Sequence, residues 1–176
     1  PGVHYSMGGI KTNAWGETVI EGLYAAGECA CVSVHGTNRL GGNGLLETVV
    51  FGKRAGMRAA ERAKGIRKME PSGRALTQDQ ERIRHLMERT KGEPVWQLRE
   101  ELGKTMNQFV GIFRTREKIE KARVCLLDLR KRVDQVTLQD KGRIFNIQLT
   151  AAFELESVYE LARVITESSL FREESR

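Results

Sequence analysis

The 176-residue sequence predicts an α/β segment with short strands, a glycine-rich loop and one helix, followed by an all-α antiparallel helical bundle. Two observations support this division. Residues 1 to about 65 are rich in glycine and short β-type runs, whereas residues 76–176 repeat apolar residues at helical spacing. Residues 65–75, with the run Pro-Ser-Gly at 71–73, have the composition of a linker.

The first segment contains three predicted elements. Residues 10–13 and 17–20 are short strand-like runs joined by a turn, which predicts a β-hairpin. Residues 23–27 form a short apolar run typical of a strand buried in a parallel sheet. From Gly44 to about Lys64, apolar and small residues recur along one stripe, which predicts a helix that approaches its neighbours closely.

The second segment predicts three to four amphipathic helices. Thr77 has capping-box spacing with Gln80, Pro94 suits the first turn of a second helix, and Thr115 can cap a third. The expected inner face of the third helix is Ile119, Ala122, Leu126, Leu129 and Val133. A fourth apolar stripe is Leu149, Ala152, Phe153, Leu155, Val158, Tyr159, Ala162 and Ile165. Short connections between these helices favour an antiparallel scaffold without a polar site.

The most informative stretch is residues 35–47, HGTNRLGGNGLLE. Its glycines let the backbone lie against a flat or anionic group without interference from Cβ atoms. The helix that follows presents unpaired N–H groups and the positive end of its dipole. We therefore predict a loop that holds an anionic or electron-rich ligand, with Arg39 free to clamp a carboxylate through two parallel hydrogen bonds.

Three further residues are candidates for polar roles. Glu28 follows the predicted strand, where open α/β sheets bind ligands, and can accept hydrogen bonds from a ribityl chain or ribose; the alternative is a helix-initiating turn. His4 lies near a Gly-Gly pair and is suited to binding a carboxylate of a small diacid, although a structural histidine has the same pattern. We expect a structural role for His35.

Composition argues against several other classes of function. The formal charge is +6, but the basic residues alternate with glutamates along the predicted helices, which indicates a solvated face rather than nucleic-acid binding. Cys29, Cys31 and Cys125 lack the spacing of metal ligands, so we expect reduced cysteines and no metal. No apolar run has the length of a membrane span.

The order of the motifs is more specific than any single residue. The segments at 4–9 (HYSMGG), 22–28 (GLYAAGE) and 35–43 (HGTNRLGGN), followed by 46–52 (LETVVFG), resemble the flavoprotein subunit of succinate dehydrogenase and fumarate reductase. The second half, with Phe-Arg-Thr at 113–115, resembles the carboxy-terminal helical domain of that family. The resemblance covers essentially the whole chain.

The resemblance implies interconversion of succinate and fumarate by hydride transfer to or from FAD. Residues 1–68 would then be the carboxy-terminal portion of the FAD-binding domain, and residues 76–176 the helical domain. By their match to the family motifs, His4 and Arg39 would bind the substrate, whereas three other positions would bind the cofactor: Glu28, Gly44 and Leu45. The family commonly has serine at position 44 and alanine at position 37, where this chain has Gly44 and Thr37.

Other parts expected of the family do not occur in this sequence. They are the Gly-x-Gly-x-x-Gly fingerprint, the histidine that usually carries FAD covalently, and the arginine that serves as general acid. We therefore expect a piece of a longer polypeptide that is inactive alone, with no catalytic residue of its own and with the general-acid arginine upstream of Pro1. The implied partners are succinate or fumarate and an iron–sulfur subunit, without nucleic acid.

The resemblance also predicts a place in the cell, cytoplasmic or on the cytoplasmic face of the inner membrane, with membrane contact only through other subunits. Two alternatives stay open at this point. One is an L-aspartate oxidase-like flavoprotein, which shares similar motifs, although Gly41-Gly42 and the run at 49–52 favour the dehydrogenase side. The other is a helical docking module for an iron–sulfur subunit.

Overall fold

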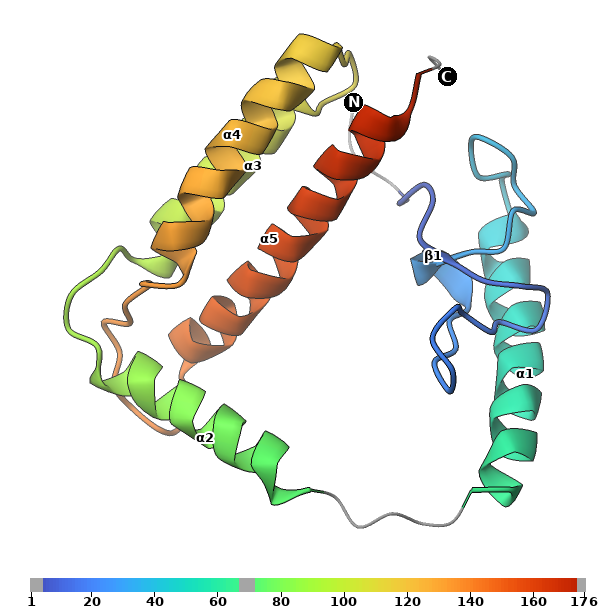
Figure 1. Cartoon of the computed structure of the whole chain (residues 1–176), viewed down its shortest axis with the longest axis horizontal. Helices are drawn as coiled ribbons and strands as arrows, with labels where there is room; N and C mark the ends of the chain where they lie inside the picture. The colour runs from blue at the N-terminus through green and yellow to red at the C-terminus, as the bar shows by residue number, and fades with distance from the viewer. Residues whose placement is uncertain (1–4, 67–71, 174–176) are drawn as a thin grey trace. The chain divides into compact units, whose positions relative to one another are not determined.

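The computed structural model describes residues 5–66 and 72–173 (Figure 1). The chain divides between residues 71 and 72 into two compact units, which are described separately. It is mostly helical with one small sheet, as the α/β segment followed by helices predicted. The elements are β1 (Ile10–Lys11), a 3-10 helix η1 (Gly27–Cys29), β2 (Ala30–Cys31), α1 (Asn43–Lys64), α2 (Gly73–Glu88), α3 (Val95–Phe109), α4 (Arg116–Val133) and α5 (Ile147–Phe171).

The strand pairing differs from the predicted one. β1 pairs in parallel with β2, with Ile10 opposite Ala30, so the predicted hairpin between residues 10–13 and 17–20 is wrong. The side chain of Asn13 instead closes a tight turn by accepting hydrogen bonds from the N–H groups of Trp15 and Glu17. The chain after this turn folds back on itself, and Glu17 forms an isolated antiparallel bridge with Tyr24.

The predicted strand at residues 23–27 is also wrong, because the second strand comes slightly later in the chain. Gly27–Cys29 form the 3-10 turn η1, which is closed by a hydrogen bond from the Ala30 N–H to the Gly27 carbonyl. Extended backbone resumes only at Ala30, which is 2% exposed. The turn places the Glu28 backbone beside the end of the sheet.

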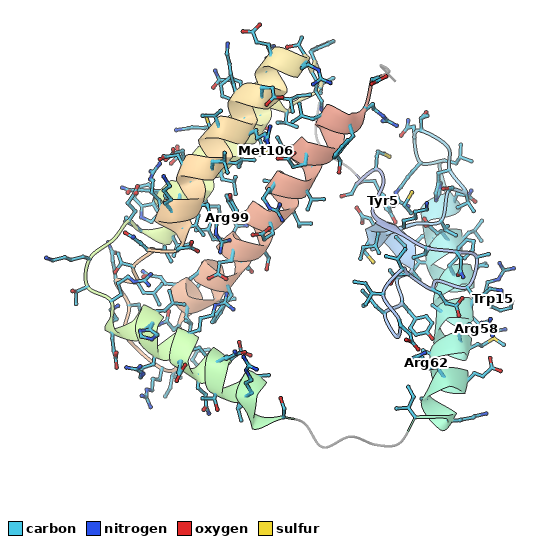
Figure 2. The ribbon with its side chains drawn as sticks, viewed as in Figure 1. Tyr5, Trp15, Arg58, Arg62, Arg99 and Met106 are labelled. Atoms are coloured by element: carbon cyan, nitrogen blue, oxygen red, sulfur yellow. The ribbon has the colours of Figure 1, made fainter. Side chains whose placement is uncertain are left out.

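Helix α1 begins at Asn43 and ends at Lys64, which confirms the helix predicted from Gly44 to about Lys64. The loop at 13–16 packs on it: Arg58 lies over the Trp15 ring at 5.3 Å from its centroid (Figure 2). A Cβ built on Gly16 would lie 2.6 Å from the Cβ of Ala55, so this contact requires glycine. Much of the predicted apolar stripe is exposed within this chain, including Val49 at 70%.

In the second unit, two of the three predicted helix-start signals coincide with the observed start of a helix. Thr115 caps α4 by accepting a hydrogen bond from the Lys118 N–H, as predicted, and α3 begins directly after Pro94. The predicted capping box at Thr77 is wrong, because α2 already begins at Gly73. The Thr77 hydroxyl therefore lies inside the helix and donates to the carbonyl of Gly73.

The core of the second unit lies between α3, α4 and α5, which pack against one another (Figure 1). All five residues predicted for the inner face of α4 are buried: Ile119, Ala122, Leu126, Leu129 and Val133. Burying one leucine side chain contributes about 1.5–3 kcal/mol, so this stripe is a main source of stability. The α5 stripe is narrower than predicted, because Val158 and Ile165 are 37% and 46% exposed.

An ion network joins three segments of this unit. Arg132 on α4 donates to Glu93, which precedes α3, at 2.6 Å and to Glu101 on α3 at 2.7 Å. The guanidinium bonds both oxygens of each carboxylate. The hydrogen bond from Arg132 lowers the pKa of the Glu93 carboxyl below its ordinary value. The network therefore links α4 to α3 and to the segment that precedes α3.

Candidate functional site

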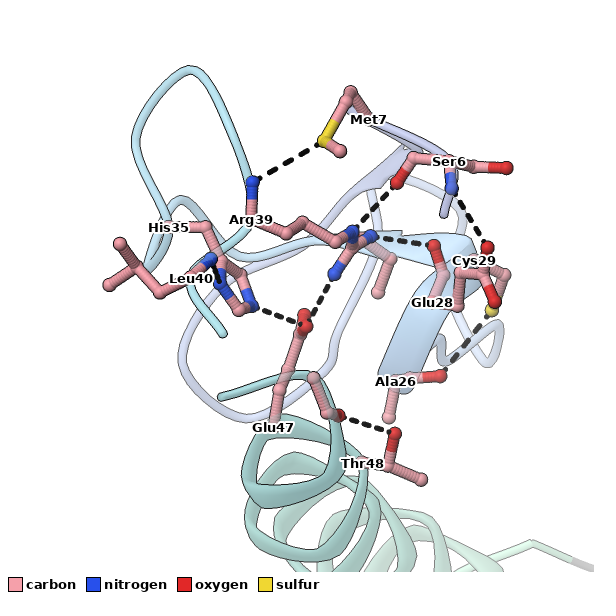
Figure 3. Close-up of polar contacts among 12 residues, drawn as sticks. Ser6, Met7, Ala26, Glu28, Cys29, His35, Arg39, Leu40, Glu47 and Thr48 are labelled. Carbon is pink, nitrogen blue, oxygen red and sulfur yellow. Dashed lines mark hydrogen bonds and ion pairs between the residues drawn. The ribbon is translucent and has the colours of Figure 1, made fainter. Parts of the chain in front are cut away.

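The candidate site lies in the first unit, where the loop between β2 and α1 carries His35 and Arg39. Arg39 is held by contacts with three segments (Figure 3). Its Nε donates to the carbonyl of Ser6 at 2.7 Å, and its Nη2 donates to the carbonyl of Glu28 at 2.8 Å. Its Nη1 donates to the Glu47 carboxylate on α1 at 2.5 Å.

This placement differs from the free guanidinium that the loop sequence predicted. The Arg39 side chain is only 8% exposed, and all three of its nitrogens donate to the protein. The Tyr5 ring covers one side of the guanidinium, with its centroid 4.7 Å from Cζ. The arginine is therefore preorganised by its neighbours, which lowers the entropy lost when it binds a further acceptor.

Glu47 is the residue that sequence reasoning missed. Its side chain is 2% exposed, and its Oε2 also meets His35 Nε2 at 2.8 Å. The Leu40 N–H donates to His35 Nδ1 at 3.1 Å, which matches the structural role expected for His35. A glutamate near the start of a helix is ordinary because it complements the helix dipole, so the local sequence contains no signal for this contact.

The residues proposed to contact the cofactor lie around the start of α1. Glu28 is exposed, and its carboxylate accepts a hydrogen bond from the Ser6 N–H at 2.9 Å, while its carbonyl accepts from Arg39. Gly44 lies in the first turn of α1 beside Tyr5, and Leu45 is 80% exposed. His4 lies outside the described residues, so its role in binding the substrate stays a prediction.

The backbone before the start of α1 is open and rich in glycine. The residue before the helix is Gly42, with φ of 77°, which has no side chain to cap the N–H groups of the first turn. A Cβ at Gly41 or Gly42 would meet nothing within 4 Å, so the backbone there is open. Open backbone at the positive end of a helix dipole can lie against a flat or anionic group.

The described residues offer neither a metal site nor a membrane span. Within residues 5–66 and 72–173, no group of three or more His, Cys, Asp or Glu side chains could hold a metal ion. The three cysteines are free thiols. No helix in those ranges is both long and apolar enough to cross a membrane.

Two family models match the chain in separate ranges. Residues 1–45 match the FAD binding domain, and residues 99–176 match the fumarate reductase flavoprotein C-term. The first match includes Glu28 and Arg39 and extends into the first turn of α1.

Relatives match over the whole chain. It is 41% identical to a fumarate reductase flavoprotein subunit of Proteus vulgaris and 37% identical to a succinate dehydrogenase flavoprotein subunit of Rickettsia bellii. All of this chain is covered in both comparisons, but only 30% and 31% of the relatives. Among solved structures, a mutant of Escherichia coli quinol fumarate reductase FrdA is similar with a TM-score of 0.88 and 39% identity.

Mycobacterium smegmatis Sdh1 is similar with a TM-score of 0.91 and 34% identity. These two structural comparisons cover 98% of this chain and 30% or 29% of the other. The relatives and solved structures carry the names of the same family that the order of motifs around Arg39 indicated. The chain therefore belongs to the family of fumarate reductase and succinate dehydrogenase flavoprotein subunits, and it spans about 30% of the length of the relatives that it matches.

Proposed function

We propose that this chain forms part of the active site of an FAD-dependent flavoprotein subunit that interconverts succinate and fumarate by hydride transfer. The observation that carries the proposal is the cluster in which Arg39 lies beside the open start of α1, in a chain 41% identical to a fumarate reductase flavoprotein. Residues 1–68 then supply the carboxy-terminal portion of the FAD-binding domain. Residues 76–176 supply the helical domain, with its helices in antiparallel order.

The substrate in this proposal is a four-carbon dicarboxylate held by His4 and Arg39. A guanidinium suits this task because it carries a permanent charge and its N–H groups match the geometry of a carboxylate. The contacts of Arg39 with two carbonyls and Glu47 leave its orientation well defined. An oriented donor stabilises charge in the transition state without first having to reorganise.

FAD is the cofactor, and when bound it supplies the hydride acceptor or donor. Glu28 would accept hydrogen bonds from its hydroxyl groups, while the backbone of Gly44 and Leu45 would face the flavin at the start of α1. Gly44 fits its surroundings, because a Cβ there would lie 3.1 Å from the Tyr5 hydroxyl oxygen. The general-acid arginine belongs, in this proposal, to the part of the protein outside these 176 residues.

The proposed partner is an iron–sulfur subunit of the same complex. A similar solved structure is a quinol-fumarate reductase with menaquinol molecules, which supports membership in a complex that exchanges electrons with a quinone. The proposed place is cytoplasmic or peripheral at the cytoplasmic face of the inner membrane, through other subunits. The helical unit could contribute to docking of the iron–sulfur subunit, whereas the names of the relatives favour this function over an L-aspartate oxidase.

The proposal is tested by Arg39→Ala in the full-length protein that contains this chain. We expect loss of about 3–5 kcal/mol of transition-state binding for succinate, with the FAD content unchanged. Arg58→Ala is the matched control, because Arg58 is a half-exposed α1 arginine paired with Glu17 and Glu61. Near-normal succinate and fumarate turnover by the Arg39 variant, or turnover of aspartate in place of succinate by the wild type, would refute the proposal.

A further inference from the structure

We propose that Glu47 is a positioning residue that holds Arg39 in a set orientation relative to the start of α1, with His35 as a second anchor. The inference rests on the proposed function, since it concerns the geometry of that same site. It assigns to Glu47 the task of keeping the substrate-binding guanidinium and the flavin-facing end of the helix in register. Among the described residues, Glu47 is the residue of α1 that forms a hydrogen bond with Arg39.

The first argument is the burial of the Glu47 carboxylate. Its side chain is 2% exposed, and a carboxylate removed from water is strongly destabilising unless it is paired. The Arg39 side chain, itself 8% exposed, supplies the opposite charge at 2.5 Å. Each of these two groups therefore requires the other, and their mutual geometry is closely constrained.

The second argument is the tautomer of His35. Because the Leu40 N–H donates to Nδ1, that nitrogen must be the acceptor, and the proton of the neutral ring lies on Nε2. Nε2 then donates to Glu47 Oε2 at 2.8 Å. The same carboxylate oxygen thus accepts hydrogen bonds from two residues of the loop, His35 and Arg39 (Figure 3).

The third argument is what the other contacts of Arg39 leave undetermined. Nε and Nη2 bond to carbonyls of Ser6 and Glu28, which lie in other segments of the first unit. Those contacts orient the guanidinium toward the sheet but do not tie it to α1. Without Glu47, Arg39 would lose both its countercharge and the bond that relates it to the helix. A shift of about 1 Å in a positioning group can lower a rate by about 100-fold.

The experiment uses the full-length holoenzyme with Glu47→Ala, Glu47→Gln and, as the matched control, Glu61→Ala on the exposed side of α1. We expect Glu47→Ala to lower kcat/KM for succinate by about 100-fold with unchanged FAD content. Glu47→Gln should lose less, because its amide oxygen can still accept from Arg39 and His35. Glu61→Ala should match the wild type. Titration of malonate against the flavin absorbance reports dicarboxylate binding without turnover.

A double-mutant cycle separates positioning from a merely structural role. If Glu47 acts through Arg39, then Glu47→Ala should add no further loss to Arg39→Ala. The rate of FAD reduction by succinate in a single turnover can be measured even for variants whose steady-state turnover is very slow. Additive losses, or wild-type kcat/KM and malonate binding in Glu47→Ala, would overturn the inference while the proposed function stands. If Glu47→Ala loses FAD, the cycle is repeated with Glu47→Gln. A loss of kcat/KM that disappears in the Arg39→Ala background supports the inference, and an equal loss in both backgrounds overturns it.

Different results would overturn the proposed function and the positioning role of Glu47. A wild-type holoenzyme that neither oxidises succinate nor reduces fumarate overturns the proposed function, and the inference with it. An active wild type with an inactive Arg39→Ala and a normal Glu47→Ala overturns the inference alone.

Discussion

At the scale of single residues, the first unit depends on close contacts that few side chains can make. Gly16 shows this most clearly, because it combines a positive φ of 73° with an approach of 2.6 Å between a built Cβ and the Cβ of Ala55. Gly36 has the same φ of 73°, but a Cβ there would meet nothing within 4 Å. The pair therefore separates the cost of backbone strain from the cost of a steric clash.

We predict that Gly16→Ala destabilises the protein by about 2–4 kcal/mol, because left-handed strain of about 1–2 kcal/mol adds to overpacking against α1. Gly36→Ala should cost only about 1–2 kcal/mol, from strain alone. Urea unfolding of the full-length variants measures both. Equal losses for the two variants would mean that the contact between Gly16 and Ala55 is not tight.

At the scale of elements, the helices of the second unit begin at polar caps that differ in importance. Thr115 caps α4 by accepting one hydrogen bond from the Lys118 N–H, whereas Asn146 caps α5 and is buried. The Asn146 amide also donates to the carbonyls of Asp140 and Gly142. Loss of its side chain would therefore remove these two hydrogen bonds as well as the cap of α5.

We predict a graded response to alanine substitution at these positions. Thr115→Ala should cost about 1 kcal/mol, the usual value for a lost cap. Asn146→Ala should cost more, about 2–3 kcal/mol, because the partner carbonyls lose their donor. Thr77→Ala is the control and should change stability by less than about 0.5 kcal/mol, since this exposed hydroxyl lies inside α2. Thermal unfolding that ranks the three otherwise would contradict this account.

The network around Arg132 predicts a dependence of stability on pH. Arg132 lowers the pKa of the folded Glu93 carboxyl, mainly through its hydrogen bond, so the ionised form is favoured in the folded state. Its contribution is therefore fully present above the unfolded pKa, which is near 4.5, and is lost as the pH falls through the lower folded value. At neutral pH the contribution is at most about 1 kcal/mol, because the groups are partly exposed.

Arg132→Met should therefore be destabilised relative to the wild type at pH 7, and the difference should shrink below about pH 4.5. Arg84→Met, which removes an exposed i,i+4 pair with Glu88, is the control and should show a much smaller difference at neutral pH. Unfolding free energies measured from pH 7 to pH 3 give the result. A difference for Arg132→Met that stays constant over this range would refute the assigned cause.

At the scale of the whole molecule, the chain represents about 30% of the length of its relatives, and α1 shows what this implies. Apolar side chains on this helix are largely exposed here, including Leu45 at 80%, Leu46 at 61% and Val49 at 70%. Exposed apolar residues in such numbers on one helix mark a surface that packs against other protein. We infer that further polypeptide of the flavoprotein covers this face.

We predict that a cysteine introduced by Val49→Cys reacts with a thiol reagent in the 176-residue chain but is protected in the full-length protein. The polar end of α1 supplies the control, because Glu61→Cys should react in both. Peptide mass spectrometry separates these sites from the exposed native Cys29. Equal reactivity of Val49→Cys in the two proteins would show that the helix face stays uncovered.

Features that depend on residues close together in the chain could be predicted from the sequence, whereas contacts between distant residues could not. The extent of α1, the Thr115 cap and the inner face of α4 were predictable, because each depends on residues within one or two helical turns. The order of motifs from 4 to 52 likewise indicated the family. The cap predicted at Thr77 was wrong because α2 begins at Gly73, four residues earlier and within the stretch predicted as a linker.

The partners of Arg39 were decided only by the tertiary structure. The guanidinium meets Ser6, 33 residues away, and Glu47, eight residues away across a loop, and neither spacing corresponds to a regular element. The parallel pairing of β1 with β2 across 20 residues is of the same kind. Sequence alone therefore determined the helices and the residue types of the candidate site. Loop conformation determined which donors and acceptors meet, because contacts between distant segments form only when the whole unit is packed.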